Sequence, residues 1–161
     1  RLEPNFSFYD INDLINISVD KVQKEFMNRK LTKSIPDDMP LIYIDLGLME
    51  QVLKNLLINS VKYSGDDSEI SIYSKYDSDF VYIILSDKGE GIAEEHLPHI
   101  FDKFYRVNKT KTGGSGLGLS IAKGFVQAHK GEIAVRNNPD AGVTFEIKIP
   151  NIKYTIDEKQ L

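Results

Sequence analysis

The chain contains no cysteine, and this absence excludes both a disulfide-stabilised scaffold and a thiolate metal site. Its apolar runs are all far shorter than the ~20 residues that a membrane-spanning helix needs, and no signal-peptide pattern opens the chain. An excess of positive charge is also lacking, since the net charge is −4. General nucleic-acid binding is therefore not expected, and only a local basic patch would support it.

The length of 161 residues fits one compact domain, which at this size needs no metal or disulfide for stability. We assign this domain to residues 1–150 and a polar C-terminal tail to residues 151–161. The opening letters, RLEPNF, lack an initiator methionine, so we expect the chain to be a piece of a longer protein.

Helical and strand patterns are mixed along the chain. Asp10 and Asp45 are expected to cap helices, because each precedes an apolar pattern of helical period. The later strands are joined by short turns, which favours an α+β fold: a two-layer α/β sandwich with a mixed, mostly antiparallel sheet and helices on one face. Residues 102–115 show no period and are expected to form a long mobile loop. We expect helices at 11–30, 46–63, 93–101 and 117–129, and strands at 6–10, 31–36, 41–44, 69–76, 79–87, 131–137 and 142–150.

The helix expected at 46–63 has two different faces. Met49, Leu53, Leu56, Leu57 and Ser60 fall on one side, and a polar stripe falls on the other. A solvated surface would explain such a stripe. However, two asparagines spaced i,i+4 are unfavourable inside a helix unless they are used. Amide oxygens followed by an ammonium group suit a magnesium–phosphate complex. The stripe consists of Gln51, Asn55, Asn59 and Lys62.

The segment DKGEGI follows a buried strand. Asp87 can accept a hydrogen bond from the exocyclic amino group of adenine, and Gly89 and Gly91 would let the backbone approach a flat ligand. An ordinary turn after a strand has the same pattern. A calcium loop is excluded, because it needs more acidic residues at alternate positions.

The segment GGSGLGLS is rich in glycine but is not a Walker A loop, because no lysine follows Gly118. It matches neither the dinucleotide fingerprint nor the protein-kinase loop. A KTG at Lys111 and an S-x-x-K starting at Ser18 are typical of penicillin-binding enzymes, but the S-D-N element between them is missing. Gly116 and Gly118 lead into a helix whose free N–H groups favour an anion. A flexible loop before a helix is the alternative.

Four blocks in this order resemble the catalytic ATP-binding domain of sensor histidine kinases: QVLKNLLINSVKYS, DKGEGI, IFDKFYRV and GGSGLGLSIAKGFVQAHKGEI. The resemblance extends from about Phe6 to Pro150. It implies a Bergerat-type ATP-binding fold and protein-histidine kinase activity that uses ATP and Mg²⁺. PDDMPLIYID and GFVQAHKGEI are most similar to the potassium-sensing branch of that family.

The resemblance also implies roles for individual residues. Asn59 corresponds to the ligand of Mg²⁺, with Asn55 supporting the metal–phosphate site. Lys62 corresponds to the basic residue on the phosphates, and Tyr63 to an aromatic residue of the nucleotide pocket. By the same correspondence, Asn55, Asn59 and Lys62 form the catalytic group.

The remaining correspondences concern the base pocket, the lid and the second glycine box. Asp87 corresponds to the carboxylate that reads adenine, and Phe101 and Phe104 to the aromatic block that anchors a mobile lid. Arg106 is expected to reach the terminal phosphates. Ser60 and Ser115 replace the more usual alanine and threonine, which should not abolish binding. The base pocket would be shaped by Gly89, Gly91 and Ile92, and the second glycine box would comprise Gly114, Ser115, Gly116, Leu117, Gly118 and Leu119.

Related ATPases of this fold commonly have a glutamate as general base one turn before the metal asparagine. Here that position is Asn55, which cannot abstract a proton. Transfer of the phosphoryl group to a separate nucleophile is therefore favoured over hydrolysis of ATP. The acceptor would be an imidazole on a separate helical dimerisation domain, because His96, His99 and His129 do not lie in an acceptor motif. A metal site between His96 and His99 is not expected.

The resemblance implies a cytoplasmic domain of a membrane-anchored sensor, without membrane contact of its own, that serves a cognate response regulator. Two other functions are alternatives. One is a nucleotide-dependent interaction module that transfers no phosphate. The other is nucleic-acid binding through Lys103, Arg106, Lys109 and Lys111, which the acidic total charge disfavours.

Overall fold

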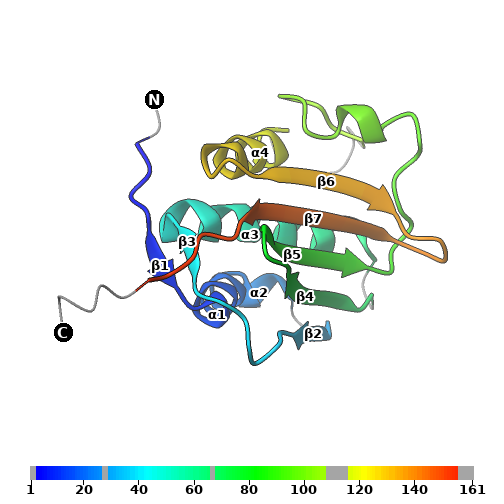
Figure 1. Ribbon diagram of the computed structural model, residues 1–161. Helices are drawn as coiled ribbons and strands as arrows, with labels where there is room; N and C mark the ends of the chain where they lie inside the picture. The colour runs from blue at the N-terminus through cyan, green and yellow to red at the C-terminus, as the bar shows by residue number, and fades with distance from the viewer. Residues whose placement is uncertain (1–2, 27–28, 66–67, 108–115, 156–161) are drawn as a thin grey trace.

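The computed structural model describes residues 3–26, 29–65, 68–107 and 116–155 (Figure 1). It contains a two-stranded sheet, β1–β3, and a five-stranded sheet of order β2–β4–β5–β7–β6. The strands are β1 (Ser7–Tyr9), β2 (Leu31–Ser34), β3 (Ile42–Ile44), β4 (Ile70–Tyr76), β5 (Phe80–Asp87), β6 (Glu132–Asn137) and β7 (Val143–Pro150). The helices are α1 (Ile11–Lys21), α2 (Gln23–Phe26), α3 (Leu46–Tyr63), the 3₁₀ turn η1 (Leu97–His99) and α4 (Gly118–Ala128).

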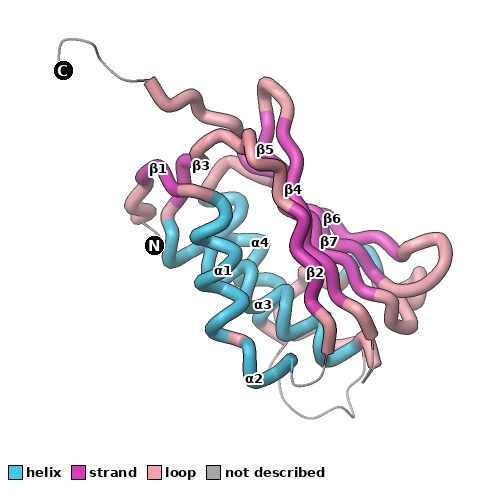
Figure 2. The backbone as a smooth tube through the Cα atoms, turned by 90° about the horizontal axis from the view of Figure 1, so that it is seen from below, coloured by secondary structure: helices cyan, strands magenta, loops and turns pink. Residues whose placement is uncertain are grey.

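The five-stranded sheet is mixed and mostly antiparallel, as the sequence predicts. The pairs β4–β5, β5–β7 and β6–β7 are antiparallel, and only β2–β4 is parallel. Helices α1, α3 and α4 all lie on one face of this sheet (Figure 2). The α+β, two-layer architecture is therefore confirmed.

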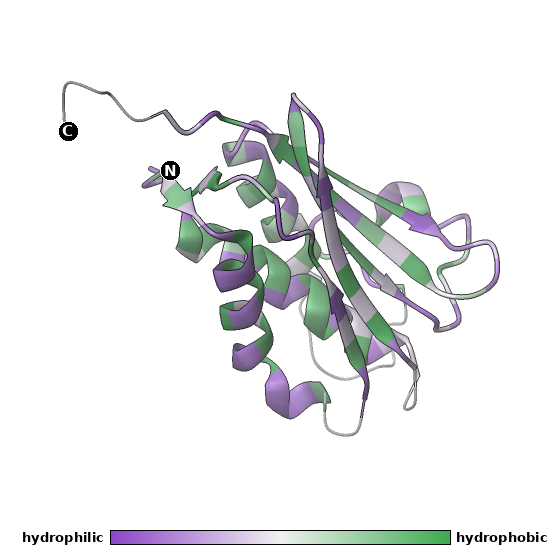
Figure 3. Ribbon diagram, turned by 60° about the horizontal axis from the view of Figure 1, so that its bottom comes forward, coloured by the Kyte–Doolittle hydropathy of each residue, from purple (hydrophilic) through white to green (hydrophobic). Residues whose placement is uncertain are grey.

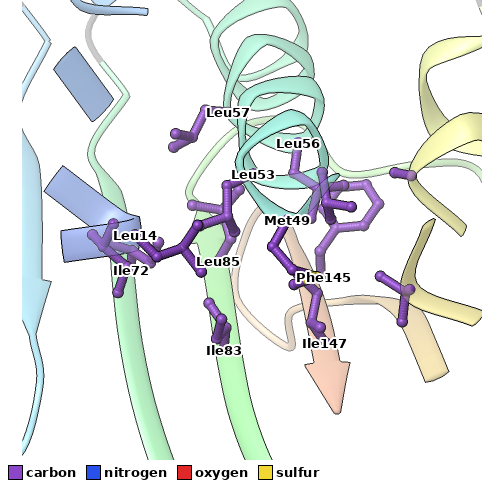
Figure 4. Packing of buried hydrophobic residues seen from close by; sticks show 14 of the residues in the cluster. Leu14, Met49, Leu53, Leu56, Leu57, Ile72, Ile83, Leu85, Phe145 and Ile147 are labelled. Carbon is purple, nitrogen blue, oxygen red and sulfur yellow. The ribbon is translucent and has the colours of Figure 1, made fainter. Parts of the chain in front are cut away.

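Helix α3 packs its apolar face onto the middle of the sheet. Met49, Leu53, Leu56 and Leu57 are fully buried, and Figure 4 shows Met49 and Leu53 beside labelled side chains of β5 and β7. Apolar and polar residues alternate along the strands (Figure 3), because successive side chains of a strand point to opposite faces. Burial of each such side chain stabilises the fold by roughly 1.5–3 kcal/mol.

Both predicted helix caps are present. The Asp10 side chain accepts a hydrogen bond from the Asn12 N–H at 2.8 Å, and that of Asp45 accepts one from the Leu48 N–H at 3.0 Å. The Asp45 N–H donates to Nε2 of His129 at 3.0 Å, and Nδ1 of His129 lies 2.7 Å from the Phe125 carbonyl oxygen. His129 thus joins the start of α3 to the end of α4.

Two expected helices differ from the structure. The helix expected at 11–30 breaks at Val22 into α1 and α2, and both Val22 at the break and Phe26, the last residue of α2, lie in the core. The helix expected at 93–101 is reduced to η1, because Pro98 has no N–H to donate to a helical hydrogen bond.

The strands at 31–36 and 41–44 also end in different sheets, since β2 pairs with β4 and β3 pairs with β1. Strand β7 ends at Pro150, where the tail was expected to begin, although the Tyr154 ring still contacts Phe8 at a centroid distance of 5.0 Å. In the described part of the chain, none of the helices has the length and apolarity that a membrane crossing requires.

Candidate functional site

A cavity of about 520 Å³ lies between the polar face of α3, the loop after β5, residues 105–107 and the start of α4. The structure brings most of the predicted site residues to this cavity, although they come from segments far apart in the sequence. Those that line it are Asn55, Asn59, Lys62, Tyr63, Asp87, Gly91, Ile92, Arg106, Gly116, Gly118 and Leu119.

Three residues of the polar stripe of α3, Asn55, Asn59 and Lys62, form one wall of the cavity because the opposite face of the helix is fixed in the core, whereas Gln51 does not line it. Gln51 Nε2 donates to Asn55 Oδ1 at 2.9 Å, and Asn55 Nδ2 donates to the Gly118 carbonyl oxygen at 2.9 Å. Asn55 therefore connects α3 to the first residue of α4. Asn59 and Lys62 follow one and two turns later on the same wall.

Asp87 is the buried charge of the cavity, with 5% of its surface exposed. Its Oδ1 accepts hydrogen bonds from the N–H groups of Gly89 at 3.0 Å and Val143 at 3.2 Å. Burial raises the pKa of the Asp87 carboxyl above its usual value, while these two hydrogen bonds and the charge of Arg29 act in the opposite direction. The carboxylate is thus costly to keep charged, and its hydrogen bonds offset part of that cost.

Two glycines allow the close packing around Asp87. A Cβ at Gly142 would lie 2.0 Å from the Asp87 carbonyl oxygen, and the φ of Gly142 is +89°. A Cβ at Gly89 would lie 2.4 Å from the Cα of Ser64. Gly89 does not line the cavity itself. It affects the shape of the cavity indirectly, by donating a hydrogen bond to Asp87 and by packing against the end of α3.

Other predicted residues lie beside the cavity. The Phe101 ring packs edge-on against Phe145 at 6.2 Å between centroids. Phe104 is 68% exposed, and its N–H donates to the Gly116 carbonyl oxygen at 2.9 Å. Leu117 precedes α4 without lining the cavity, whereas Gly114 and Ser115 lie outside the described residues.

Sequence reasoning missed several residues of the site. Asn137 holds the Ile92 backbone by two hydrogen bonds, accepting from its N–H at 2.8 Å and donating to its carbonyl oxygen at 2.6 Å. Asn137 lies 45 positions from Ile92, so no local pattern could have indicated it. Tyr105 could have been found, because it stands beside Arg106 in the block IFDKFYRV. The cavity-lining residues that were missed are Ile58, Glu90, Ile100, Tyr105, Val107 and Val143.

The donor set of the cavity fits magnesium in the presence of phosphates. The described residues contain no group of three or more His, Cys, Asp or Glu side chains that could hold a metal ion by themselves. Mg²⁺ usually keeps several waters and takes one or two protein oxygens together with substrate phosphates. The amide oxygen of Asn59, on the cavity wall, suits that coordination.

Solved structures share this fold. The catalytic domain of the histidine kinase ThkA superposes with a TM-score of 0.81 at 30% identity, over 91% of this chain and 95% of that one. ThkA in complex with the response regulator protein TrrA superposes with a TM-score of 0.76 at 26% identity, over 90% of this chain and 41% of that one. The fold is therefore that of histidine-kinase catalytic domains.

The family assignment follows from the sequence match. The sequence-family model of the histidine kinase-, DNA gyrase B- and HSP90-like ATPases matches residues 44–153. The chain therefore belongs to this family.

Relatives include sensor protein KdpD of Clostridium acetobutylicum, 39% identical over 87% of this chain and 16% of its own length. Another is sensor protein CiaH of Streptococcus pneumoniae, which is 43% identical over 67% of this chain and 25% of its own length. The chain thus spans a quarter or less of the length of these relatives.

We predict that Asp87→Asn raises the free energy of unfolding of the ligand-free domain at neutral pH. A proton bound to Asp87 stabilises the folded state fully below the unfolded pKa of about 3.9, and this contribution is lost as the pH rises through the raised folded pKa. Above that range a charged carboxylate remains buried, whereas asparagine is neutral.

Urea unfolding of both proteins over a series of pH values measures this difference. The stability of the variant relative to the wild type should grow from about pH 4 upward and then level off. A relative stability that decreases with rising pH would contradict the prediction.

Proposed function

We propose that this chain binds ATP with Mg²⁺ in the cavity and positions the γ-phosphoryl group for transfer to a histidine on a separate helical domain. The observation that carries the proposal is that one cavity has the buried carboxylate of Asp87 in its lining and the amide and ammonium groups of Asn59 and Lys62 on its wall. These two parts suit the base and the phosphates of a nucleotide.

Adenine recognition follows from how Asp87 is bonded. Its Oδ1 already accepts two backbone N–H groups, so Oδ2 is the oxygen that can accept the exocyclic amino group of the base. Such a bond to a charged, desolvated acceptor is stronger than a neutral one. Ile92, Ile100 and Val143 supply apolar surface for the ring in the same cavity.

Phosphate binding is assigned to the wall formed by α3 and the start of α4. Lys62 supplies positive charge, and Gly118 begins a helix of 11 residues whose first N–H groups face no intrahelical acceptor. Mg²⁺, held by Asn59, would neutralise charge on the phosphate oxygens when bound. Together these groups orient the phosphates and stabilise charge that develops during transfer.

Transfer is favoured over hydrolysis by the bonding of Asn55. Its two side-chain polar atoms are engaged by Gln51 and Gly118, and an amide is no base. Glu90 also lines the cavity, but it belongs to the loop after β5, three residues from Asp87, on the side assigned to the base. The nucleophile is therefore proposed to come from outside the chain. An imidazole nitrogen would bond to the γ-phosphorus as the bond from phosphorus to the ADP oxygen breaks.

The relatives indicate the setting of this reaction. They are named as sensor proteins, and ThkA has been solved with a response regulator. We therefore propose that this chain is the cytoplasmic catalytic domain, residues 1–150, of a membrane-anchored sensor histidine kinase. Its partners would be the phosphoacceptor helical domain of the same protein and a cognate response regulator. Membership of the potassium-sensing branch stays a prediction, because the identity to KdpD, 39% over 146 residues, is lower than that to CiaH, 43% over 111 residues.

Asp87→Asn is predicted to weaken ATP binding on the order of 10- to 100-fold, because a bond to a charged acceptor is lost. The asparagine oxygen would keep the two backbone N–H groups, and its NH₂ group would face the amino group of adenine. The affinity for GTP should fall much less, because guanine has a carbonyl group where adenine has its exocyclic amino group. Calorimetric titration with ATP and GTP gives the ratio, and an equal loss for both would contradict base reading.

Asn59→Ala is predicted to remove the magnesium-dependent part of ATP affinity while the fold stays intact, because Asn59 faces the cavity rather than the core. Titration with and without EDTA measures that part. The matched control is Asn16→Ala, an exposed asparagine on α1 outside the cavity lining. Wild-type magnesium dependence in the Asn59 variant would disprove the metal assignment.

Phosphotransfer can be tested by mixing the domain with a helical hairpin that carries an acceptor histidine and with γ-labelled ATP. We expect acid-labile, base-stable label on the hairpin, and none on a hairpin whose histidine is replaced by glutamine. Strong ATP binding without label would instead favour a nucleotide-dependent interaction module.

A further inference from the structure

The segment from Ala93 to Tyr105 connects two walls of the cavity. It begins just after Gly91 and Ile92 and ends at Tyr105, and these three residues line the cavity. Four successive turns run along it, in which the N–H groups of residues 96, 99, 102 and 105 each donate to the carbonyl oxygen three positions earlier, at 2.9–3.2 Å. The path of the backbone along this segment is thus fixed by hydrogen bonds between residues three positions apart.

One side-chain bond closes this segment into a loop. Nδ1 of His96 and the hydroxyl of Tyr105 are hydrogen-bonded, and their ring centroids lie 5.7 Å apart. The Glu95 carboxylate lies 3.8 Å from Nε2 of His96. In the tautomer with its proton on Nε2, Nδ1 is the acceptor and the tyrosine hydroxyl donates to it. The His96 side chain is 25% exposed, so this bond is partly shielded from water.

Tyr105 is held by side-chain contacts rather than by regular structure, and its ring also lies 5.5 Å from that of His99 between centroids. Residues 100–107 contain no regular helix or strand, and Phe104 is 68% exposed. The Phe104 N–H reaches Gly116, and Phe101 packs on Phe145. Both contacts hold the segment to the rest of the domain, whereas the His96 bond holds the hydroxyl of Tyr105, a residue that lines the cavity.

We propose that His96 is a positioning residue for nucleotide binding: by accepting the hydroxyl of Tyr105, it holds the Tyr105–Val107 wall of the cavity at a fixed distance from the Gly91–Ile92 wall. This inference rests on the proposed function, because it assigns the gain to nucleotide affinity. Tyr105 is the residue that borders the ligand, and His96 acts only through it. A wall held in place before binding loses less freedom when the ligand arrives.

The test uses Mg²⁺ with a non-hydrolysable ATP analogue and calorimetry on four variants of the chain. His96→Leu and Tyr105→Phe should each weaken binding by about 2- to 10-fold, the range expected for one hydrogen bond. The double variant should be no weaker than either single one. His96→Asn should restore affinity, because the asparagine Oδ1 occupies nearly the place of Nδ1. A fifth variant, His99→Leu, is the control for the hydrogen bond: the His99 ring also contacts that of Tyr105, at 5.5 Å between centroids, but its described side-chain hydrogen bond goes to Asp102. It should therefore retain wild-type affinity.

Wild-type affinity in His96→Leu and Tyr105→Phe, additive losses in the double variant, or no rescue by asparagine would each overturn the proposal. Failure of the wild type to bind the analogue would refute the proposed function instead. Hydrogen exchange of the ligand-free protein then still tests the bond. The amide of Tyr105, which donates to Asp102 at 3.2 Å, should exchange faster in His96→Leu but not in His96→Asn. Unchanged exchange in both variants would show that the bond positions nothing.

Discussion

The burial of the Asp87 carboxylate is the constraint on which this site depends. A buried charge needs hydrogen-bond donors, and here they come from Gly89 on the next loop and from Val143 at the start of β7. Those donors reach it only because Gly142 has no side chain to separate the two backbones. The same packing brings the ends of β5 and β7 together. With the base-reading role proposed for Asp87, stability and ligand recognition oppose each other at this residue, as they often do at binding sites.

Helix α3 contributes residues both to the core and to the cavity wall, so the packing of the core determines the geometry of the cavity. Its buried leucines fix the rotation of the helix on the sheet, and this rotation places Asn59 and Lys62 on the cavity wall. A substitution that tilted the helix would displace the polar groups by the same amount. The interior is close-packed, so small shifts in the core are transmitted to the wall rather than absorbed.

The sequence alone was sufficient for features with a local cause. The two faces of α3, the caps Asp10 and Asp45, the hairpins and the position of Asp87 all follow from periodicity or from neighbouring residues. Features set by distant contacts were not predictable: Val143 reaches Asp87 across 56 positions, and β2 finds its partner in β4 rather than in β3. The break at Val22 and the loss of helix around Pro98 show tertiary packing and a missing N–H overriding an apolar period.

The bond from Asn55 to the Gly118 carbonyl has an entropic consequence. Because it ties the first residue of α4 to a rigid helix, the first turn of α4 is already ordered without a ligand. In the proposed function, the amides of this turn bind phosphate; they then lose little conformational freedom on binding, and more of the interaction energy remains as affinity. A glutamate at this position would set its carboxylate against the carbonyl oxygen. General-base chemistry and a preordered α4 are thus competing uses of one side chain.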